Sequence, residues 1–143
     1  MPVLIIVIAL VCTSCRERPP EVWHYLQEAG YQYEDAKRWA FIEEGKTARI
    51  DYERSEEGFR QGMMTLIRLN QAMEKRYGPS KDPFDNSKIP PCATEDVKCI
   101  MTYLLNGTAW FDHIDNYQHT GGRVLIGGEF NATKFTVIVT CHD

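Results

Sequence analysis

Residues 123–141 read RVLIGGEFNATKFTVIVTC, and this stretch decides the fold class. Apolar side chains alternate with other side chains before and after Asn131-Ala132-Thr133. The apolar side carries Val124, Ile126 and Phe130 before this tripeptide and Phe135, Val137, Val139 and Cys141 after it. An alternation with a period of two, interrupted by turn-forming residues, predicts two half-buried antiparallel strands joined by a turn.

Two more strands are predicted upstream of this hairpin. Residues 98–105 are rich in side chains that favour strands, and Asn106-Gly107 is the strongest short signal for a hairpin turn. Residues 108–117 follow as a strand, and residues 119–122 turn the chain again, which gives an antiparallel meander of four strands. Residues 96–105, DVKCIMTYLL, also have helical spacing, so the first two strands could instead include a helix.

The part of the chain before residue 79 is predicted to be helical. Residues 20–78 carry short apolar stripes that stop at Gly30 and Gly45, and glycine commonly ends a helix. The clearest helix covers residues 55–77, where Ser55 can cap the start and Gly78-Pro79 stops the end. Residues 79–91 contain four prolines and form a connection to the β part, residues 92–143. We therefore predict one α+β domain, with N-terminal helices packed on a C-terminal antiparallel β-meander.

The N-terminus has the pattern of a secretion signal. Residues 3–12 are ten consecutive apolar positions, half of the about 20 that a membrane-spanning helix needs. Small residues and then charges follow, which predicts a signal peptide over residues 1–14 and a secreted, extracellular domain over residues 15–143. The alternative is lipidation of Cys15, since Thr13 and Ser14 suit that processing, and it would make a bacterial envelope lipoprotein.

The cysteine count agrees with an oxidising compartment. Of five cysteines, Cys12 would leave with the signal peptide. Cleavage after Ser14 leaves an even set that predicts disulfides, namely Cys15, Cys92, Cys99 and Cys141. Cys92 and Cys99 are close enough to close a small loop, but all three pairings of the four cysteines stay open. Cleavage after Cys15 would instead leave three cysteines and one unpaired thiol.

Two N-glycosylation sequons point the same way, at Asn106-Gly107-Thr108 and at Asn131-Ala132-Thr133. Together with the signal peptide they favour a eukaryotic or viral glycoprotein over a bacterial lipoprotein.

The formal net charge of −4 argues against a nucleic-acid partner, because such a partner requires a basic face. We predict no contact with a membrane unless Cys15 is lipidated.

One polar stretch, WFDHIDNYQH at residues 110–119, could carry chemistry. On a strand His113 and Asp115 share a face, opposite to Asp112, and could offer two metal ligands with His119 as a third. No recognised metal, nucleophile or phosphate motif is present in the chain. The preferred interpretation is therefore a solvated polar hairpin, and neither a metal nor a cofactor is predicted.

A series of short matches resembles C-type lysozymes and α-lactalbumins: YLQEAGY, RWAFIEEG, SEEGFRQ, KIPPC, DVKC and GTAW, in this order over residues 25–110. In that family a glutamate after a Trp-containing helix is the general acid and an aspartate is its partner, and the best-placed acids here are Glu44 and Glu56. The helix match without gaps instead puts Lys46 at the acid, and the family's eight-cysteine framework is absent. The resemblance implies a glycoside hydrolase or a catalytically degenerate relative that binds sugar.

A second resemblance is to cystatins. RVLIGGEF followed by FTVIVTC is similar to their strand–loop region, where a Gln-x-Val-x-Gly loop inserts into protease clefts. Arg123 and Leu125 replace the Gln and the Val, and Gly127 is kept. This resemblance implies an inhibitory module, although the order and spacing of the cysteines do not match that family.

These patterns predict a small secreted glycoprotein, stabilised by disulfides, that binds or inhibits another macromolecule without a cofactor. The partner would be an extracellular protein or glycan, and aromatic side chains near Trp110 and Phe111 could form the contact. The alternative is a lysozyme-like glycoside hydrolase or its degenerate relative, with Glu44 and Glu56 as the catalytic pair. Between the two, a protein without enzymatic activity is preferred.

Overall fold

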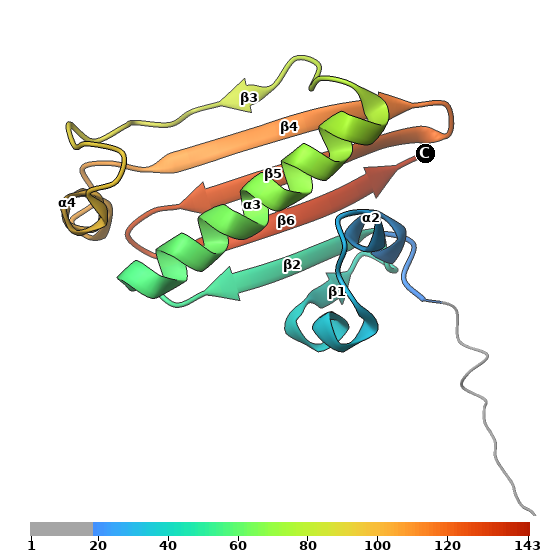
Figure 1. Cartoon of the computed structure of the whole chain (residues 1–143), viewed down its shortest axis with the longest axis horizontal. Helices are drawn as coiled ribbons and strands as arrows, with labels where there is room; N and C mark the ends of the chain where they lie inside the picture. Colours follow the sequence, from blue (N-terminus) through green and yellow to red (C-terminus); the bar gives the residue numbers. More distant parts are fainter. Residues whose placement is uncertain (1–18) are drawn as a thin grey trace, which may run out of the picture.

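A computed structural model describes residues 19–143, so the predicted signal peptide and Cys15 lie outside the described residues. The described part forms a mixed α+β structure around a six-stranded antiparallel sheet with the strand order β1-β2-β6-β5-β4-β3 (Figure 1). The strands are β1 (Ala40–Ile42), β2 (Thr47–Tyr52), β3 (Phe84–Asp85), β4 (Phe111–His119), β5 (Gly122–Phe130) and β6 (Phe135–His142). No helix in this part of the chain is long and apolar enough to cross a membrane.

The hairpin predicted from residues 123–141 is confirmed as β5 and β6. Phe130 pairs with Phe135 next to the turn, and Val124 pairs with Cys141 at the other end. The apolar positions of both strands share one face and are almost completely buried, with exposed fractions of 0–2%. We call this the inner face of the sheet, and the alternate side chains form the outer face.

The long helix predicted over residues 55–77 is also confirmed, as α3 (Glu56–Tyr77). The Ser55 hydroxyl accepts a 3.0 Å hydrogen bond from the Gly58 amide, and Gly78 ends the helix with a φ of 91°. The helix crosses the inner face of the sheet (Figure 1). The approach is close, because a Cβ at Gly62 would lie 2.7 Å from the Phe130 ring.

The prediction that residues 31–45 are helical is only partly correct, because the helical part is a short 3₁₀ helix and strands follow it. The chain forms α2 (Trp23–Glu28), a 3₁₀ helix η1 (Tyr33–Arg38), and then the strands β1 and β2. Residues 47–52 become a strand because Ala48 and Ile50 alternate with polar neighbours and can pair with β6 along its whole length. Strands therefore stand among the helices, and the predicted order of helices first and strands second is only partly correct.

The predicted strand over residues 98–105 is wrong, and the helical alternative is correct. These residues form α4 (Val97–Leu105), capped by a 3.2 Å hydrogen bond from the Cys99 amide to the Asp96 carboxylate. Met101 and Leu104 bury one side of the helix, a spacing that a strand cannot provide. Asn106-Gly107 consequently ends a helix and is not a hairpin turn, so the meander has three strands. Residues 79–91 are a connection, except for the two-residue edge strand β3.

Candidate binding groove

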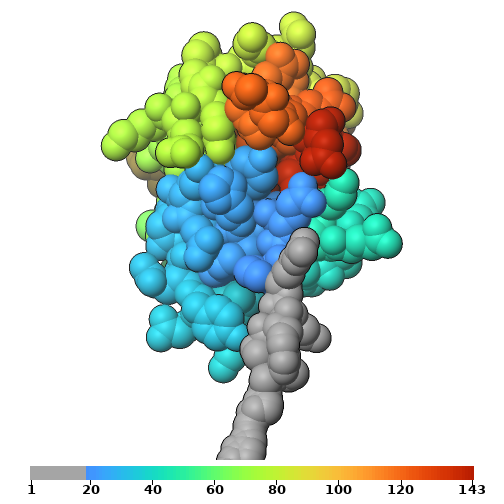
Figure 2. Space-filling view, turned by 90° about the vertical axis from the view of Figure 1, so that its right-hand side faces the viewer, coloured from blue at the N-terminus to red at the C-terminus, as the bar shows by residue number. Residues whose placement is uncertain are grey.

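A groove of about 1220 Å³ lies between α2, the C-terminal half of α3 and the turn from β4 to β5. Figure 2 faces this side of the molecule, where α2 in blue meets the end of α3 in yellow-green and the β4–β5 turn in orange. The groove is open to solvent along its length. It is lined by His24, Tyr25, Glu28, Arg68, Gln71, Ala72, Lys75, Arg76, Tyr77, Gln118, His119 and Thr120.

The wall of the groove that α3 provides consists of side chains from one face of this helix. Its members are Arg68, Gln71, Ala72, Lys75 and Arg76. Residues spaced by three and four positions share one helix face, so these side chains project to the same side. The lining therefore holds three cationic side chains and one carboxylate, an excess of two positive charges on a chain with a formal net charge of −4.

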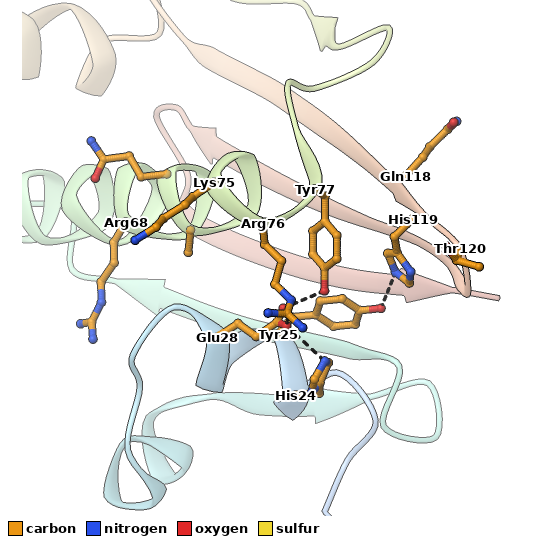
Figure 3. A pocket seen from close by; sticks show the side chains of 12 residues that line it. His24, Tyr25, Glu28, Arg68, Lys75, Arg76, Tyr77, Gln118, His119 and Thr120 are labelled. Carbon is orange, nitrogen blue, oxygen red and sulfur yellow. Dashed lines mark hydrogen bonds and ion pairs between the residues drawn. The ribbon is translucent and has the colours of Figure 1, made fainter.

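Glu28 is the carboxylate of the groove and joins α2 to α3. Arg76 Nε lies 2.6 Å from Glu28 Oε2, and the Tyr77 hydroxyl donates a 2.8 Å hydrogen bond to Oε1 (Figure 3). His24 Nε2 lies 3.3 Å from the same carboxylate. The Glu28 side chain is only 13% exposed, and its buried Oε2 accepts no hydrogen bond from the described residues, so the nearby charge of Arg76 is what offsets the water lost at that oxygen. Glu28 is consequently a fixed internal anchor of the groove.

His119 on β4, Tyr25 on α2 and Tyr77 at the end of α3 form an aromatic wall of the groove. The His119 ring stacks on the Tyr77 ring at a centroid distance of 4.8 Å, and its Nε2 lies 2.8 Å from the Tyr25 hydroxyl. The Gly121 amide donates to His119 Nδ1 at 3.2 Å. Because Nδ1 accepts this bond, the neutral ring carries its proton on Nε2 and donates it to the Tyr25 oxygen. Burial, with a smaller contribution from Tyr77, raises the pKa of Tyr25 to about 12, which keeps it a phenol.

The cations of the groove differ in how firmly they are held. Arg68 Nε donates a 2.7 Å hydrogen bond to the Ala29 carbonyl, and its guanidinium lies 4.0 Å above the centre of the Tyr31 ring. Arg76 is paired with Glu28. Lys75, in contrast, forms no ion pair with any residue between 19 and 143 and is exposed. Arg68 and Lys75 therefore both keep a charge that no carboxylate among residues 19–143 neutralises, and Lys75 is the one that no other side chain holds in place.

The structure does not bring Glu44 and Glu56 together. Glu44 lies in the turn between β1 and β2, whereas Glu56 opens α3. These two points are at opposite ends of the six-residue strand β2, which is about 20 Å long at the usual rise per residue. A glycosidase pair is separated by roughly 5 to 9.5 Å. Each glutamate therefore stands alone in this structure.

The polar residues of β4 are only partly gathered. His113 Nε2 lies 3.1 Å from Asp115 and its Nδ1 lies 3.8 Å from Asp85, whereas Asp112 points to the outer face. His119 stands at the far end of β4, in the groove. Within residues 19–143 no group of three or more His, Cys, Asp or Glu side chains is arranged to hold a metal ion.

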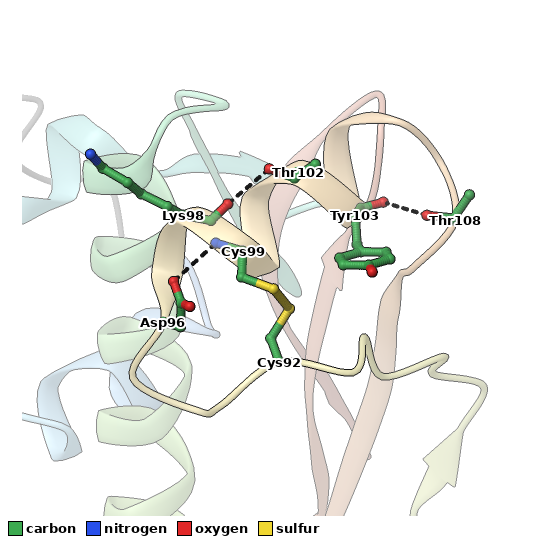
Figure 4. Close-up of a disulfide and its surroundings, with 7 residues drawn as sticks. All are labelled: Cys92, Asp96, Lys98, Cys99, Thr102, Tyr103 and Thr108. Atoms are coloured by element: carbon green, nitrogen blue, oxygen red, sulfur yellow. Dashed lines mark hydrogen bonds between the residues drawn. A yellow bond between two sulfur atoms is a disulfide. The ribbon is translucent and has the colours of Figure 1, made fainter.

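One disulfide is present among the described residues. Cys92 and Cys99 are bonded at 2.08 Å and tie the segment just before α4 to the first turn of this helix (Figure 4). Cys141 is buried, and its thiol lies 3.8 Å from a carboxylate oxygen of Glu21, six residues after Cys15 in the chain. Because Cys92 and Cys99 bond to each other, Cys15 is the cysteine of the predicted set left for Cys141, and we predict a bond between these two.

The two sequons lie in turns at the same end of the sheet. Asn106 follows α4, and Asn131 lies in the β5–β6 turn. Asn131 and Gly107, the residue after Asn106, line a hollow of about 300 Å³ together with Trp110. Trp110 is half-buried, and its indole nitrogen donates a 2.6 Å hydrogen bond to the Asn86 carbonyl. Phe111 also lines the hollow, but its ring points to the inner face and packs against Phe130.

Most residues of the groove do not stand out in the sequence. The stripe of Arg68, Lys75 and Arg76 along α3 could have been found from its spacing of seven and eight positions, which is two helical turns. No sequence signal connects Tyr25 with His119, which are 94 residues apart. No protein-family model, curated protein or solved structure matches the chain, so its resemblances to lysozymes and cystatins stay predictions.

Proposed function

We propose that the protein is a secreted binding module that recognises an acidic segment of another extracellular protein. The single observation that carries this proposal is the excess of positive charge in the groove, on a chain that is otherwise acidic. A groove lined by one sign of charge concentrates ligands of the opposite sign. The predicted signal peptide, sequons and disulfides support the extracellular setting.

The shape of the groove favours an extended peptide. Enclosed pockets of roughly 300–1,000 Å³ are typical for small ligands, whereas this groove is larger and open. Arg68 and Arg76 are eight residues apart on α3, which corresponds to about 12 Å along the helix axis. An extended peptide covers that distance with about four residues. Two or three carboxylates within such a segment can therefore meet the cations of the stripe.

The aromatic wall gives the peptide a second contact. Tyr77 and His119 are stacked, and Tyr25 is hydrogen-bonded to His119, so the three rings of this wall already contact one another without a ligand. Rigid aromatic surfaces lose little side-chain entropy on binding. The peptide's backbone and apolar side chains can lie against this wall while its carboxylates face α3.

The test uses a fluorescently labelled peptide of alternating glycine and glutamate, measured by anisotropy at low and physiological salt. Lys75→Glu should weaken binding about tenfold, because it replaces an exposed cation that has no carboxylate partner by an anion. Lys98→Glu is the matched control, since Lys98 is an exposed lysine on α4, outside the groove. The control should bind as the wild type does, and affinity should fall as salt rises.

Two outcomes would reject the proposal. The first is an equal loss of affinity in Lys75→Glu and Lys98→Glu, which would indicate attraction by overall charge. The second is equal binding of a peptide in which glutamine replaces every glutamate, because that would show that carboxylates are not recognised.

A further inference from the structure

Two consecutive glycines stand in the middle of β5, and the fold requires only one of them. A Cβ at Gly128 would lie 2.7 Å from Leu66 on α3, so this position must stay small. A Cβ at Gly127 would meet only ordinary contacts, 3.5 Å from Ile114 and 3.7 Å from the His113 carbonyl. Gly127 also has no positive φ. Glycine inside a strand costs roughly 0.5–1 kcal/mol relative to alanine, so packing and backbone geometry leave Gly127 unexplained.

Gly127 lies at the floor of a depression on the outer face of the sheet. The depression has a volume of about 150 Å³. Its apolar walls come from three neighbouring strands, namely Ile114 on β4, Leu125 on β5 and Ile138 on β6. All three side chains are partly exposed, unlike the apolar side chains of the inner face. A cavity of about this size accepts a group as large as benzene, hence one apolar side chain.

One edge of the depression is acidic. Asp112 and Glu129 face each other directly across β4 and β5 and both line the depression. Like charges in directly opposite positions destabilise a sheet. Glu129 is compensated by Lys134 at 3.2 Å, but Asp112 forms no ion pair with any described residue. The carboxylate of Asp112, beside the apolar depression, is therefore left without a cation to balance its charge.

We propose that the outer face of the sheet docks a basic segment of a partner protein, which inserts one apolar side chain over Gly127 and places a lysine or arginine against Asp112 and Glu129. Glycine at position 127 keeps the hole open, and the acid pair selects the charge of the segment. The acidic segment proposed above would bind in the groove, on the other side of the sheet. The segment that docks on the outer face is basic. The two surfaces therefore select different partners.

The experiment uses synthetic peptides with the cores Lys-Leu-Lys and Lys-Phe-Lys between Gly-Ser flanks, titrated into isotope-labelled protein and followed by amide NMR. Lys-Gly-Lys and Glu-Leu-Glu peptides are the references. Binding of the basic apolar peptides should shift the amides around Gly127, Thr136 and Ile138. The reference peptides should bind at least tenfold more weakly.

Two variants separate docking from folding. Gly127→Val fills the depression with a side chain that strands favour, so it should keep or raise thermal stability and weaken peptide binding at least tenfold. Asp112→Asn should weaken binding of the basic peptides and reduce its salt dependence, whereas Glu95→Gln, on the exposed loop before α4, should not. Unchanged peptide binding in Gly127→Val would overturn the proposal. So would self-association of the chain that Gly127→Val abolishes, because the face would then bind a second copy.

Discussion

The hydroxyl of Tyr77, at the end of α3, donates a 2.8 Å hydrogen bond to the carboxylate of Glu28, at the end of α2. Arg76 and His24 approach the same carboxylate from the two helices. This contact lies at the base of the groove, so the helices that form two of its walls are joined by a charged and largely buried group. The groove is therefore part of the rigid structure and not a gap between independent elements.

Removal of this hydrogen bond should destabilise the fold. Tyr77→Phe deletes the donor and leaves Glu28 with one partner fewer, and hydrogen bonds to charged groups contribute about 1.5–3 kcal/mol. Because Tyr77 is half-buried, we expect a loss of about 1 kcal/mol in the free energy of unfolding, measured in urea. Tyr33→Phe is the control, since Tyr33 is 82% exposed, and it should change nothing. Equal stability of Tyr77→Phe and the wild type would show that water replaces the hydroxyl without cost.

Tyr25 should make the protein sensitive to alkali. Its folded pKa is raised to about 12, mainly by burial, against about 10 in the unfolded chain. Below pH 10 the phenol is protonated in both states, and its contribution to stability is fully present. Between pH 10 and 12 the unfolded chain releases the proton and the folded chain retains it, so stability falls, by at most about 3 kcal/mol.

This loss is measured by urea unfolding at a series of pH values from 8 to 11.5. Tyr25→Phe cannot ionise, so its stability should fall less steeply above pH 10 than that of the wild type. Tyr33→Phe serves again as the exposed control and should follow the wild-type curve. Parallel curves for Tyr25→Phe and the wild type would contradict the raised pKa.

The negative charge of Glu28 should weaken the binding of anionic peptides in the groove. Glu28→Gln raises the excess positive charge of the lining from two to three and keeps a group that can accept from Tyr77. We expect the acidic peptide to bind about threefold more tightly, together with a lower free energy of unfolding. Glu34→Gln removes an exposed carboxylate of η1 and should leave the affinity unchanged. Weaker binding by Glu28→Gln would mean that the carboxylate orients Arg76 toward the ligand.

The sequence predicts the fold best where the local signals are long and agree with one another. In β5 and β6 the alternation of apolar side chains continues over two whole strands, and only one face can be buried. In α3 the cap at Ser55, the apolar stripe and the stop at Gly78 agree. Each of these elements is long enough for its period to be unambiguous.

The failures occur where a short segment fits two structures. Residues 98–105 have both strand-favouring side chains and helical spacing, and the Asp96 cap, with the bond between Cys92 and Cys99, accompanies the helix. In residues 47–52 the alternation of Ala48 and Ile50 is too short to be decisive alone, and β6 supplies the partner that makes the segment a strand. The groove could not be predicted from local patterns either, because Tyr25 and Tyr77 contact His119 only in the folded chain.

The two sequons should be glycosylated to different extents. The Asn131 amide nitrogen donates a 3.1 Å hydrogen bond to Glu129, and attachment of a sugar to this nitrogen must disturb the bond. The Asn106 side chain is exposed, and its amide nitrogen has no protein partner among residues 19–143. We therefore expect fuller occupancy at Asn106. Peptide mass spectrometry after glycosidase treatment of protein secreted from eukaryotic cells measures both sites, and Glu129→Gln should leave occupancy at Asn106 unchanged.

Intact mass of the secreted protein tests the processing and the disulfides together. Cleavage after Ser14 would leave Cys15 as the first residue, available to bond with Cys141, whose thiol lies beside Glu21. Alkylation in denaturant without reductant should then label no cysteine, and alkylation after reduction should label every cysteine that the chain retains. Labelling of Cys141 alone before reduction would place the cleavage after Cys15 and leave the bond between Cys92 and Cys99 as the only disulfide. A diacylglycerol on Cys15 would contradict secretion and indicate a bacterial lipoprotein.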